Sequence, residues 1–279
     1  MITDETIINN LKEDVGFEDI TSNALIRKEK WTQAKITVKE DGIISGMEIA
    51  WYILDIFRLD IIASYHDGDK VNKGDVILEF EGDAKNILIA ERTMLNYLMH
   101  LSGISTTVNN TVMVVNKINP NIRVACTRKT TPGLQNIEKE AVKIGGADTH
   151  RFRLDDCVLI KDNHLKLVGS VIEAIELAKE AVSFTKKIEI EVETLDDAVE
   201  AALFGADIIM LDNMQPVQIE EVIKTLEEKS LRKNVIIEVS GGITPDNISK
   251  YAKLDIDVIS SGYITNSAKS LDMSLDIII

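Results

Sequence analysis

The fold is decided most clearly by residues 188–213, which read IEIEVETLDDAVEAALFGADIIMLDN. An apolar segment from Ile188 to Val192 is followed by a helical pattern from Leu195 to Phe204 and by a second apolar segment from Asp207 to Leu211. Thr194 occupies the position at which a helix N-cap residue is expected. Near-continuous apolar strands that alternate with helices are typical of a parallel sheet. This stretch therefore predicts one repeating unit of an α/β fold.

The same alternation extends on both sides of that stretch. Further strands are predicted at Ile122–Cys126, Cys157–Ile160, Val235–Val239 and Val258–Ser260, and further helices at Ile137–Ile144, Val171–Ala181, Pro216–Leu226 and Pro245–Ala252. The last helix is expected to have Thr244 as its N-cap and Pro245 as its first residue. No dinucleotide-binding glycine fingerprint follows a strand, so six such units favour an α/β barrel, complete or incomplete.

The first hundred or so residues follow a different pattern. Thr3 or Asp4 is expected to cap an amphipathic helix that runs through Leu11, and apolar and polar residues alternate from Gln33 to Lys39 as in a half-buried strand. A helical period returns between Ala84 and Leu101. These residues predict a separate unit that precedes the barrel.

Composition and charge exclude several classes of protein. The 279 residues carry a formal net charge of −15, which opposes binding to nucleic acid or to anionic membranes. No apolar run approaches the roughly 18 residues of a membrane-spanning helix, and the N-terminus lacks the features of a secretory signal, so a cytoplasmic protein is expected. Cys126 and Cys157 are too few for a disulfide framework and lack metal-ligand spacing, so we interpret them as buried small hydrophobic residues.

The charge is unevenly distributed along the chain. Residues 121–166 contain nine Lys or Arg against six Asp or Glu, which makes this segment +3 and the remainder −18. A basic centre in an acidic protein indicates a site for a small anion. On charge alone, a solvated basic face is the competing interpretation.

Polar residues follow every predicted barrel strand. In strand order they are Thr127-Arg128-Lys129-Thr130-Thr131, Lys161-Asp162-Asn163-His164, the glutamates 189, 191 and 193, Asp212-Asn213, Ser240-Gly241-Gly242, and Ser261-Gly262. A single residue of this kind is usually a turn residue or a surface charge. Because the C-terminal strand ends of a barrel meet at one edge, six such groups together predict an active site there.

The residue types indicate what this site binds. The glycine turns after the last two strands suit a phosphate held by backbone N–H groups. Cations suited to carboxylates and phosphates are available at Arg128, Lys129, Arg151 and Lys161. His150 adjoins Arg151 and is expected to contribute to the same anion site. Asp212 and one glutamate of the third strand could hold Mg²⁺ or accept hydrogen bonds from ribose hydroxyls. His164 is interpreted as a capping or supporting residue.

Longer motifs connect the chain to a known family. They are Glu13-Asp14 with Asp19-Ile20-Thr21, Ala90-Glu91-Arg92-Thr93, Leu101-Ser102-Gly103-Ile104, Thr127 through Leu134, His150-Arg151-Phe152, Leu159 through His164, Leu211-Asp212-Asn213 and Ser240-Gly241-Gly242-Ile243. In order and spacing the chain resembles the quinolinate phosphoribosyltransferases, also called nicotinate-nucleotide pyrophosphorylases (carboxylating), over nearly its whole length.

The resemblance implies an architecture and an assembly. It implies an N-terminal open α/β sandwich of residues 1–105, with residues 268–279 packing back on it, and an incomplete α/β (TIM-like) barrel of residues 106–267. It also implies a homodimer or a hexamer (trimer of dimers). By the same resemblance, Arg92 of one subunit reaches the barrel of its neighbour.

The resemblance also implies roles for individual residues. Quinolinate would be bound by Arg92, Arg128, Lys129, His150, Arg151 and Lys161, and phosphate by Ser240, Gly241, Gly242, Ser261 and Gly262. Glu191 and Asp212 would lie near the ribose and the Mg²⁺ ion, with Glu193 as the alternative to Glu191. The implied catalytic residues are Lys129, Lys161, Glu191 and Asp212.

The chain departs from the family pattern at two positions. Gln135 and Asn266 stand where family members often have an arginine and a histidine, which leaves phosphate affinity and substrate pose open. A related family linked to molybdenum transport shares Thr-Arg-Lys-Thr but lacks Lys-Asp-Asn-His, which favours the pyridine enzyme.

The implied reaction joins quinolinate to phosphoribosyl pyrophosphate and yields nicotinate mononucleotide, CO₂ and pyrophosphate in de novo NAD biosynthesis. Two hypotheses of other classes compete with it. One is a Schiff-base aldolase with Lys161 as nucleophile. The other is a catalytically silent binding protein, against which the intact Arg92, Lys129, Lys161 and Asp212 argue.

Overall fold

The computed structural model describes residues 4–26 and 28–278 and divides into two compact units. The first unit comprises residues 1–109, 131–146 and 267–279, and the second comprises residues 110–130 and 147–266. The boundary expected after residue 105 differs from this division mainly in residues 131–146, which group with the first unit.

The second unit is built on a six-stranded parallel sheet with the order β6-β11-β10-β9-β8-β7. Its strands are β6 (Arg123–Ala125), β7 (Val158–Ile160), β8 (Ile188–Val192), β9 (Ile208–Asp212), β10 (Ile236–Ser240) and β11 (Val258–Ser260). Within the described residues the pairing begins at β6 and ends at β7, so the barrel is not closed. The predicted incomplete barrel is confirmed.

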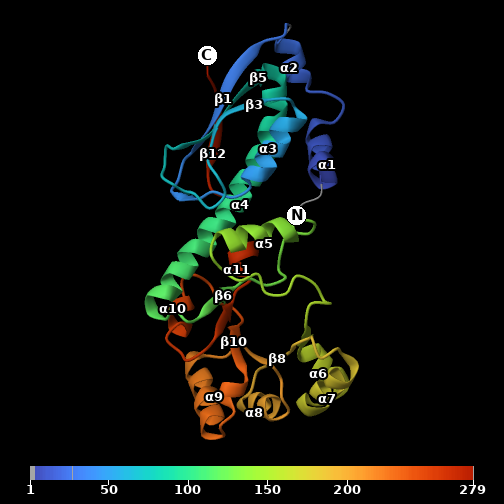
Figure 1. Cartoon of the computed structure of the whole chain (residues 1–279), viewed down its shortest axis with the longest axis vertical. Helices are drawn as coiled ribbons and strands as arrows, with labels where there is room; N and C mark the ends of the chain where they lie inside the picture. The colour runs from blue at the N-terminus through green and yellow to red at the C-terminus, as the bar shows by residue number, and fades with distance from the viewer. Residues whose placement is uncertain (1–3, 27, 279) are drawn as a thin grey trace. The chain divides into compact units, whose positions relative to one another are not determined.

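Helices surround this sheet, as the lower part of Figure 1 shows for α8 and α9. They are α6 (Asp162–Val168), α7 (Val171–Ala181), α8 (Leu195–Leu203), α9 (Pro216–Glu228), α10 (Ile248–Tyr251) and α11 (Tyr263–Asn266), with a short 3₁₀ turn, η1 (Arg232–Asn234), before β10. Thr194 caps α8 as predicted, because its side chain accepts a hydrogen bond from the Asp197 amide.

The helix predicted at Pro245–Ala252 begins three residues later in the structure, as α10. The N-cap of α10 is Asn247, whereas Thr244 and Pro245 lie in the preceding turn. The physical reason is the Asn247 side chain, which accepts from the Thr244 amide (2.9 Å) and donates to the Gly242 carbonyl (3.0 Å). These two hydrogen bonds stabilise the turn, and the helix therefore begins only at Ile248.

The first unit is an open sandwich of one antiparallel sheet and several helices (Figure 1). Its sheet has the order β12-β1-β5-β3, formed by β12 (Met273–Ile278), β1 (Trp31–Val38), β5 (Val76–Asp83) and β3 (Asp60–Ser64), and a small ladder joins β2 (Gly42–Ile43) to β4 (Lys70–Val71). Its helices are α1 (Asp4–Val15), α2 (Ile20–Leu25), α3 (Met47–Ile56), α5 (Gln135–Ile144) and most of α4 (Ala84–Ile118).

Alternation along β1 explains the core of this unit. Ala34, Ile36 and Val38 are fully buried, while the residues between them are more exposed. The C-terminal strand β12 pairs with β1 from Gln33↔Ile278 to Val38↔Met273. The end of the chain thus completes the sheet of the first unit.

Of two expectations about the N-terminal region, the structure contradicts one and does not describe the other. Helix α4 continues to Ile118, well beyond the predicted Leu101. The predicted cap at Thr3 or Asp4 lies outside the residues whose side chains the structure describes.

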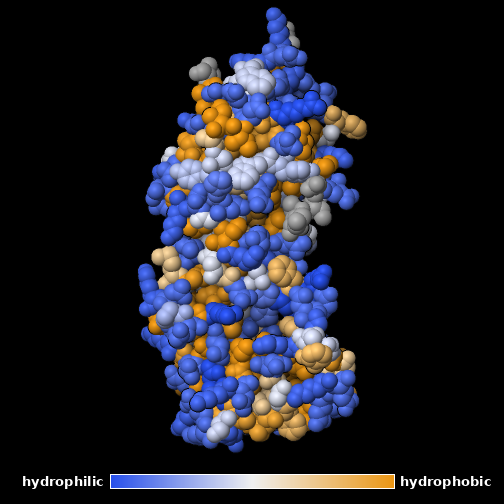
Figure 2. Space-filling view, viewed as in Figure 1, coloured by the Kyte–Doolittle hydropathy of each residue, from blue (hydrophilic) through white to orange (hydrophobic). Residues whose placement is uncertain are grey.

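The surface is mixed in polarity. On the face shown in Figure 2 hydrophilic side chains predominate on each unit, with apolar residues between them. None of the helices within residues 4–26 and 28–278 combines the length and the apolarity needed to cross a membrane.

Candidate active site

A pocket of roughly 360 Å³ lies at the C-terminal edge of the parallel sheet. We call it the mouth pocket, and its lining consists of Thr127, Arg128, Lys129, His150, Arg151, Leu159, Lys161, Glu191, Met210, Asp212, Glu238, Ser240 and Ser260. Four Lys or Arg side chains meet three carboxylates in one cavity. This combination suits a ligand that carries several anionic groups.

Lys161 and Glu191 form an ion pair in this pocket. The Nζ of Lys161 donates to Oε2 of Glu191, and the two side chains are 44% and 13% exposed. The backbone of Lys161 is fixed by His164, whose Nδ1 accepts from the Lys161 amide at 2.9 Å as helix α6 begins. The capping role predicted for His164 is confirmed.

Asp212 ends strand β9 beside Ser240, its partner in the parallel ladder with β10. Burial raises the pKa of Asp212, and Glu191 raises it further, while Lys161 opposes the rise. The Asp212 carboxylate accepts a hydrogen bond from the side chain of Asn213. A second cation beside these carboxylates would be stabilised electrostatically.

The turn after β10 has no room for a side chain at Gly241. The φ of Gly241 is +91°, and a Cβ there would lie 2.4 Å from Oδ1 of Asn213 and 2.5 Å from its backbone nitrogen. Glycine is therefore required where the chain passes Asn213. The neighbouring Gly242 also has a positive φ, of +60°, but the space around it is open.

The turn after β11 holds Lys129 in place. A Cβ at Gly262 would lie 2.8 Å from Cδ of Lys129, so the lysine side chain lies directly against this glycine. The hydroxyl of Thr265 donates to the Lys129 carbonyl at 2.9 Å, and the Lys129 amide donates to Thr127 Oγ1 at 3.1 Å. These bonds position the lysine at the mouth.

His150 lies deeper than these residues. Its backbone has a φ of +53°, and its amide donates to Oδ1 of Asp148 at 2.8 Å. Nε2 lies 3.5 Å from Glu189 and 3.3 Å from Glu238. Burial alone would lower the pKa of His150, but the two carboxylates outweigh it and raise the pKa to about 10.

Most of the predicted site residues meet in the mouth pocket. Those in its lining are Arg128, Lys129, His150, Arg151, Lys161, Glu191, Asp212 and Ser240. Gly241, Gly242 and Gly262 form the turns beside it. The hydroxyl of Ser261 instead donates to the Ile243 carbonyl in the turn after β10 and accepts from the Tyr263 amide. Arg92 belongs to the first unit, where it is exposed on α4.

Two polar residues of the pocket were missed by the sequence interpretation. Glu238 lies inside an apolar strand, and Ser260 ends β11 with a buried hydroxyl that has no hydrogen-bond partner in the described part of the chain. The sequence did contain a signal for them. A polar residue inside a buried strand destabilises the fold unless it has a hydrogen-bond partner or a role in binding.

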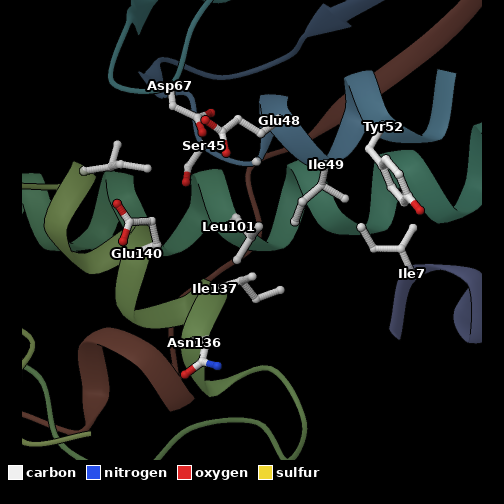
Figure 3. A pocket seen from close by; sticks show the side chains of 12 residues that line it. Ile7, Ser45, Glu48, Ile49, Tyr52, Asp67, Leu101, Asn136, Ile137 and Glu140 are labelled. Carbon is white, nitrogen blue, oxygen red and sulfur yellow. The ribbon is translucent and has the colours of Figure 1, made fainter. Parts of the chain in front are cut away.

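A second pocket, of roughly 240 Å³, lies within the first unit and has the opposite character. Figure 3 shows Glu48 and Asp67 side by side at one end and Ile7 with Tyr52 at the other. Burial raises the pKa of Asp67 even though the Met47 amide donates to its carboxylate. Among the described residues no Lys or Arg lines this pocket, so its lining does not suit a polyanionic substrate.

Comparison with known proteins identifies the family. Residues 104–276 match the quinolinate phosphoribosyl transferase C-terminal domain, and residues 19–102 match the corresponding N-terminal domain. The chain is 51% identical to a probable nicotinate-nucleotide pyrophosphorylase (carboxylating) of Methanothermobacter thermautotrophicus, with 96% of each chain covered. It is 53% identical to the protein of the same name from Methanocaldococcus jannaschii, over 96% of this chain and 95% of that one.

A solved structure agrees with these matches. The crystal structure of nicotinate-nucleotide pyrophosphorylase from Ehrlichia chaffeensis superposes with a TM-score of 0.93 at 32% identity, and covers 100% of this chain and 99% of that one. Fold and sequence therefore lead to the same family.

Proposed function

Because the chain belongs to the quinolinate phosphoribosyl transferase family, we propose that its mouth pocket joins quinolinate to phosphoribosyl pyrophosphate. The products are nicotinate mononucleotide, CO₂ and pyrophosphate, in NAD biosynthesis. The observation that carries this function is the meeting of four cationic side chains with Glu191 and Asp212 at the C-terminal edge of the sheet. Both substrates are anions that such a pocket can bind.

Different residues of the pocket suit different chemical groups of the two substrates. The guanidinium groups of Arg128 and Arg151 suit the two quinolinate carboxylates, and the turns at Gly241 and Gly262 offer backbone N–H groups to phosphate. The pyridine nitrogen forms a bond to C1 of the ribose as the bond from C1 to pyrophosphate breaks. Glu191 and Asp212 stabilise the positive charge that develops at C1.

Loss of CO₂ is explained by the positive charge on the alkylated ring nitrogen. Once the ring nitrogen is alkylated, its positive charge stabilises the carbanion left on the adjacent carbon when that carbon loses CO₂. The carbanion then takes up a proton. Lys129 and Lys161, which both line the pocket, are placed to stabilise this negative charge. Positioning and charge neutralisation suffice, so no covalent nucleophile is needed.

We propose Mg²⁺ as the cofactor, held with the help of Glu191 and Asp212. Carboxylate oxygens are the ligands that Mg²⁺ prefers, and Asp212 lies near enough to Glu191 that this second carboxylate adds to burial in raising the pKa of Asp212. When bound, Mg²⁺ neutralises charge on the departing pyrophosphate.

A Schiff-base aldolase is the competing enzyme class. In the pocket Lys161 donates a hydrogen bond to the Glu191 carboxylate, and this ion pair favours a charge-pairing role for Lys161 over that of a nucleophile. Borohydride treatment with a carbonyl substrate separates the two hypotheses. We expect no covalent trapping on Lys161.

We propose a homo-oligomer, either a homodimer or a trimer of dimers, in which Arg92 of one subunit serves the site of another. The exposure of Arg92 on α4 supports this arrangement. Large apolar side chains at Phe17, Ile20, Leu25 and Trp31 are also exposed, as expected of surfaces that an interface covers.

Mixed refolding tests the shared site. Arg92→Ala and Lys129→Ala homodimers should each be nearly inactive. Refolding them together at equal amounts should restore roughly a quarter of wild-type activity, because about half of the dimers are mixed and each holds one intact site. Activity that stays at the parental level, although mixed dimers form, contradicts the assignment of Arg92. Each variant refolded alone is the control.

The function itself is tested by incubating the protein with quinolinate, phosphoribosyl pyrophosphate and Mg²⁺ while CO₂ and nucleotide are followed. We expect equal amounts of both products. Nucleotide formed without CO₂, or neither product, contradicts the proposed reaction. A cytoplasmic location stays a prediction, supported by two cysteines that form no disulfide in the described part of the chain.

A further inference from the structure

The loop that precedes α5 begins in the second unit and ends in the first. Its start carries Arg128 and Lys129, which line the mouth pocket, whereas residues 131–146 group with the first unit. At its end the Leu134 amide donates to the Thr131 carbonyl at 3.0 Å. The Pro-Gly centre and the positive φ of Gly133, +82°, are those of a type II turn. This turn leads directly into α5.

A buried glutamate of α5 fixes the first residue of this turn. Oε2 of Glu138 accepts a hydrogen bond from the Thr131 amide at 3.1 Å, and Oε1 lies 2.8 Å from Nε2 of His100 on α4. The side chain of Glu138 is 0% exposed and that of His100 is 29% exposed. A carboxylate only accepts hydrogen bonds, so the amide and the imidazole are both donors. We call Glu138 and His100 the anchor pair.

The anchor pair ties the loop to two helices of the first unit. A buried carboxylate is strongly unfavourable unless its oxygens are hydrogen-bonded, and here one oxygen faces α4 and the other faces the loop. The two bonds join segments that are 38 and 7 positions apart along the chain. Although Thr131 itself is exposed, its amide is therefore held by a side chain of the core.

The anchored amide is close along the chain to two residues of the mouth pocket. Two residues of chain span at most about 7 Å, so the backbone of Lys129 cannot lie farther than that from Thr131. Between them, the Thr130 amide donates to the Arg128 carbonyl at 3.0 Å. On the other side, the hydrogen bonds described above hold the backbone of Lys129 within the second unit. The short segment that carries both cations is thus fixed at each end.

We propose that the anchor pair positions Arg128 and Lys129 for the reaction at the mouth, because it fixes the Thr131 amide through which their loop enters the first unit. Glu138 and His100 are positioning residues that act through the backbone of this loop. The catalytic part of this inference rests on the proposed function, whereas the anchoring of the Thr131 amide does not.

The anchor pair should affect one substrate more than the other. Arg128 is assigned to a quinolinate carboxylate, whereas phosphate is assigned to the turns at Gly241 and Gly262, which follow β10 and β11. Loosening the loop should therefore weaken quinolinate binding and leave phosphoribosyl pyrophosphate binding nearly unchanged. A change that only reduced the amount of folded enzyme would instead lower kcat and leave both KM values as they are.

The first experiment follows the amide itself and needs no activity. Hydrogen exchange of the full-length protein is measured by mass spectrometry on overlapping peptides that differ at Thr131. We expect a protected amide in wild type and exchange at least about tenfold faster in Glu138→Leu, which removes the acceptor. Glu140→Leu, the same change at a side chain of α5 that is 59% exposed, is the matched control. Equal exchange in wild type and Glu138→Leu would falsify the anchor.

The second experiment measures the KM of each substrate separately. In Glu138→Leu the KM for quinolinate should rise by about tenfold, and the KM for phosphoribosyl pyrophosphate should change by less than about twofold. Glu138→Gln keeps an oxygen that accepts from the Thr131 amide, so both of its KM values should stay near those of wild type. Glu140→Leu should also follow wild type.

His100 offers variants that keep the glutamate in place. His100→Leu removes one donor to Glu138, whereas His100→Gln can still donate. Because His100 lines a cavity of roughly 550 Å³ within the first unit, both side chains have room, and His100→Leu carries the test if Glu138→Leu does not fold. We expect the quinolinate KM to rise by about threefold in His100→Leu and to recover in His100→Gln.

Other outcomes overturn the inference. Equal rises in both KM values, or a lower kcat with both KM values unchanged, would show that the anchor pair only stabilises the fold. A Glu138→Gln variant as impaired as Glu138→Leu would show that the bond to Thr131 is not what matters. If the wild-type protein makes no nucleotide, the proposed function fails, while hydrogen exchange still decides whether Glu138 fixes the Thr131 amide. The two failures are therefore distinguishable.

Discussion

Glu189 and Glu191 lie two residues apart on the same face of β8, yet their surroundings differ completely. Glu191 lies at the mouth and is bonded to Lys161. Glu189 is fully buried, without a hydrogen-bond partner in the described part of the chain, and lies next to His150. The comparison teaches that depth in the barrel, more than residue type, decides what a carboxylate does.

The mouth and the floor also differ in how their charges are compensated. At the mouth, cations from several loops face carboxylates in a cavity that a ligand can enter. At the floor of the barrel, the buried carboxylates of Glu189 and Glu238 instead face the imidazole of His150, at 3.5 Å and 3.3 Å. Changes at the mouth should therefore affect substrate handling, and changes at the floor should affect pH dependence.

The largest effect should come from replacing quinolinate with nicotinate as the substrate. Nicotinate has one carboxylate instead of two, so it leaves cations of the pocket unpaired. We expect its kcat/KM to be lower by about 10⁴-fold, as for other sites that lose a required polar partner. Steady-state assays of nucleotide formation with each acid measure this, and equal turnover would break the comparison.

A single cation at the mouth should have the next largest effect. Lys161→Ala removes the partner of Glu191 and a group that faces developing negative charge, so kcat should fall by about 10²- to 10³-fold. Lys224→Ala, an exposed change on α9, is the matched control. Loss of activity in both variants would point to a general defect in folding.

The glycine turns should separate the two substrates. Gly241→Val places a side chain against Asn213 and should raise the KM for phosphoribosyl pyrophosphate by about 10- to 100-fold, with a much smaller effect on quinolinate. Gly242→Ala meets no atom within 4 Å and should cost only the strain of its positive φ, about 1–2 kcal/mol. If both KM values stay unchanged in Gly241→Val, these residues are turns without a binding role.

The smallest effect is thermodynamic and concerns the floor. The pKa of His150 is raised to about 10, so the folded state binds more protons than the unfolded state above pH 6.5. This contribution to stability is complete below pH 6.5 and is lost as the pH rises to about 10, with a slope of at most about 1.4 kcal/mol per pH unit. Urea unfolding at several pH values measures it. Glu189→Gln/Glu238→Gln should flatten the slope, because it removes the two carboxylates that raise the pKa of His150. An unchanged slope would contradict this cause of the shift.

Much of the barrel could be predicted because local patterns decide its strands. The predicted segments around β8, β9 and β11 agree with the structure to within one residue, since each apolar run is bounded by turn residues. The mouth could be predicted for a related reason. Parallel strands bring their C-terminal ends together, so residues such as Lys161 and Asp212 must meet whatever the details of packing.

Long-range packing decided what the sequence pattern missed. Helix α5 follows the first barrel strand but groups with the first unit. There Glu138 is hydrogen-bonded to His100 at 2.8 Å, and a Cβ at Gly145 would lie 2.7 Å from the Ser105 carbonyl. No local periodicity reports such contacts, because they join residues 36 or more positions apart along the chain.

The sequence by itself determined the parallel sheet, the order of its polar strand ends and the family, because these depend on residue type and spacing. Only the tertiary structure decided that Glu189 and Glu238 converge on His150, and that Ser260 and Glu238 line the pocket. The physical reason is that a carboxylate's charge state depends on burial and on the neighbours that folding brings to it, and the sequence specifies neither directly.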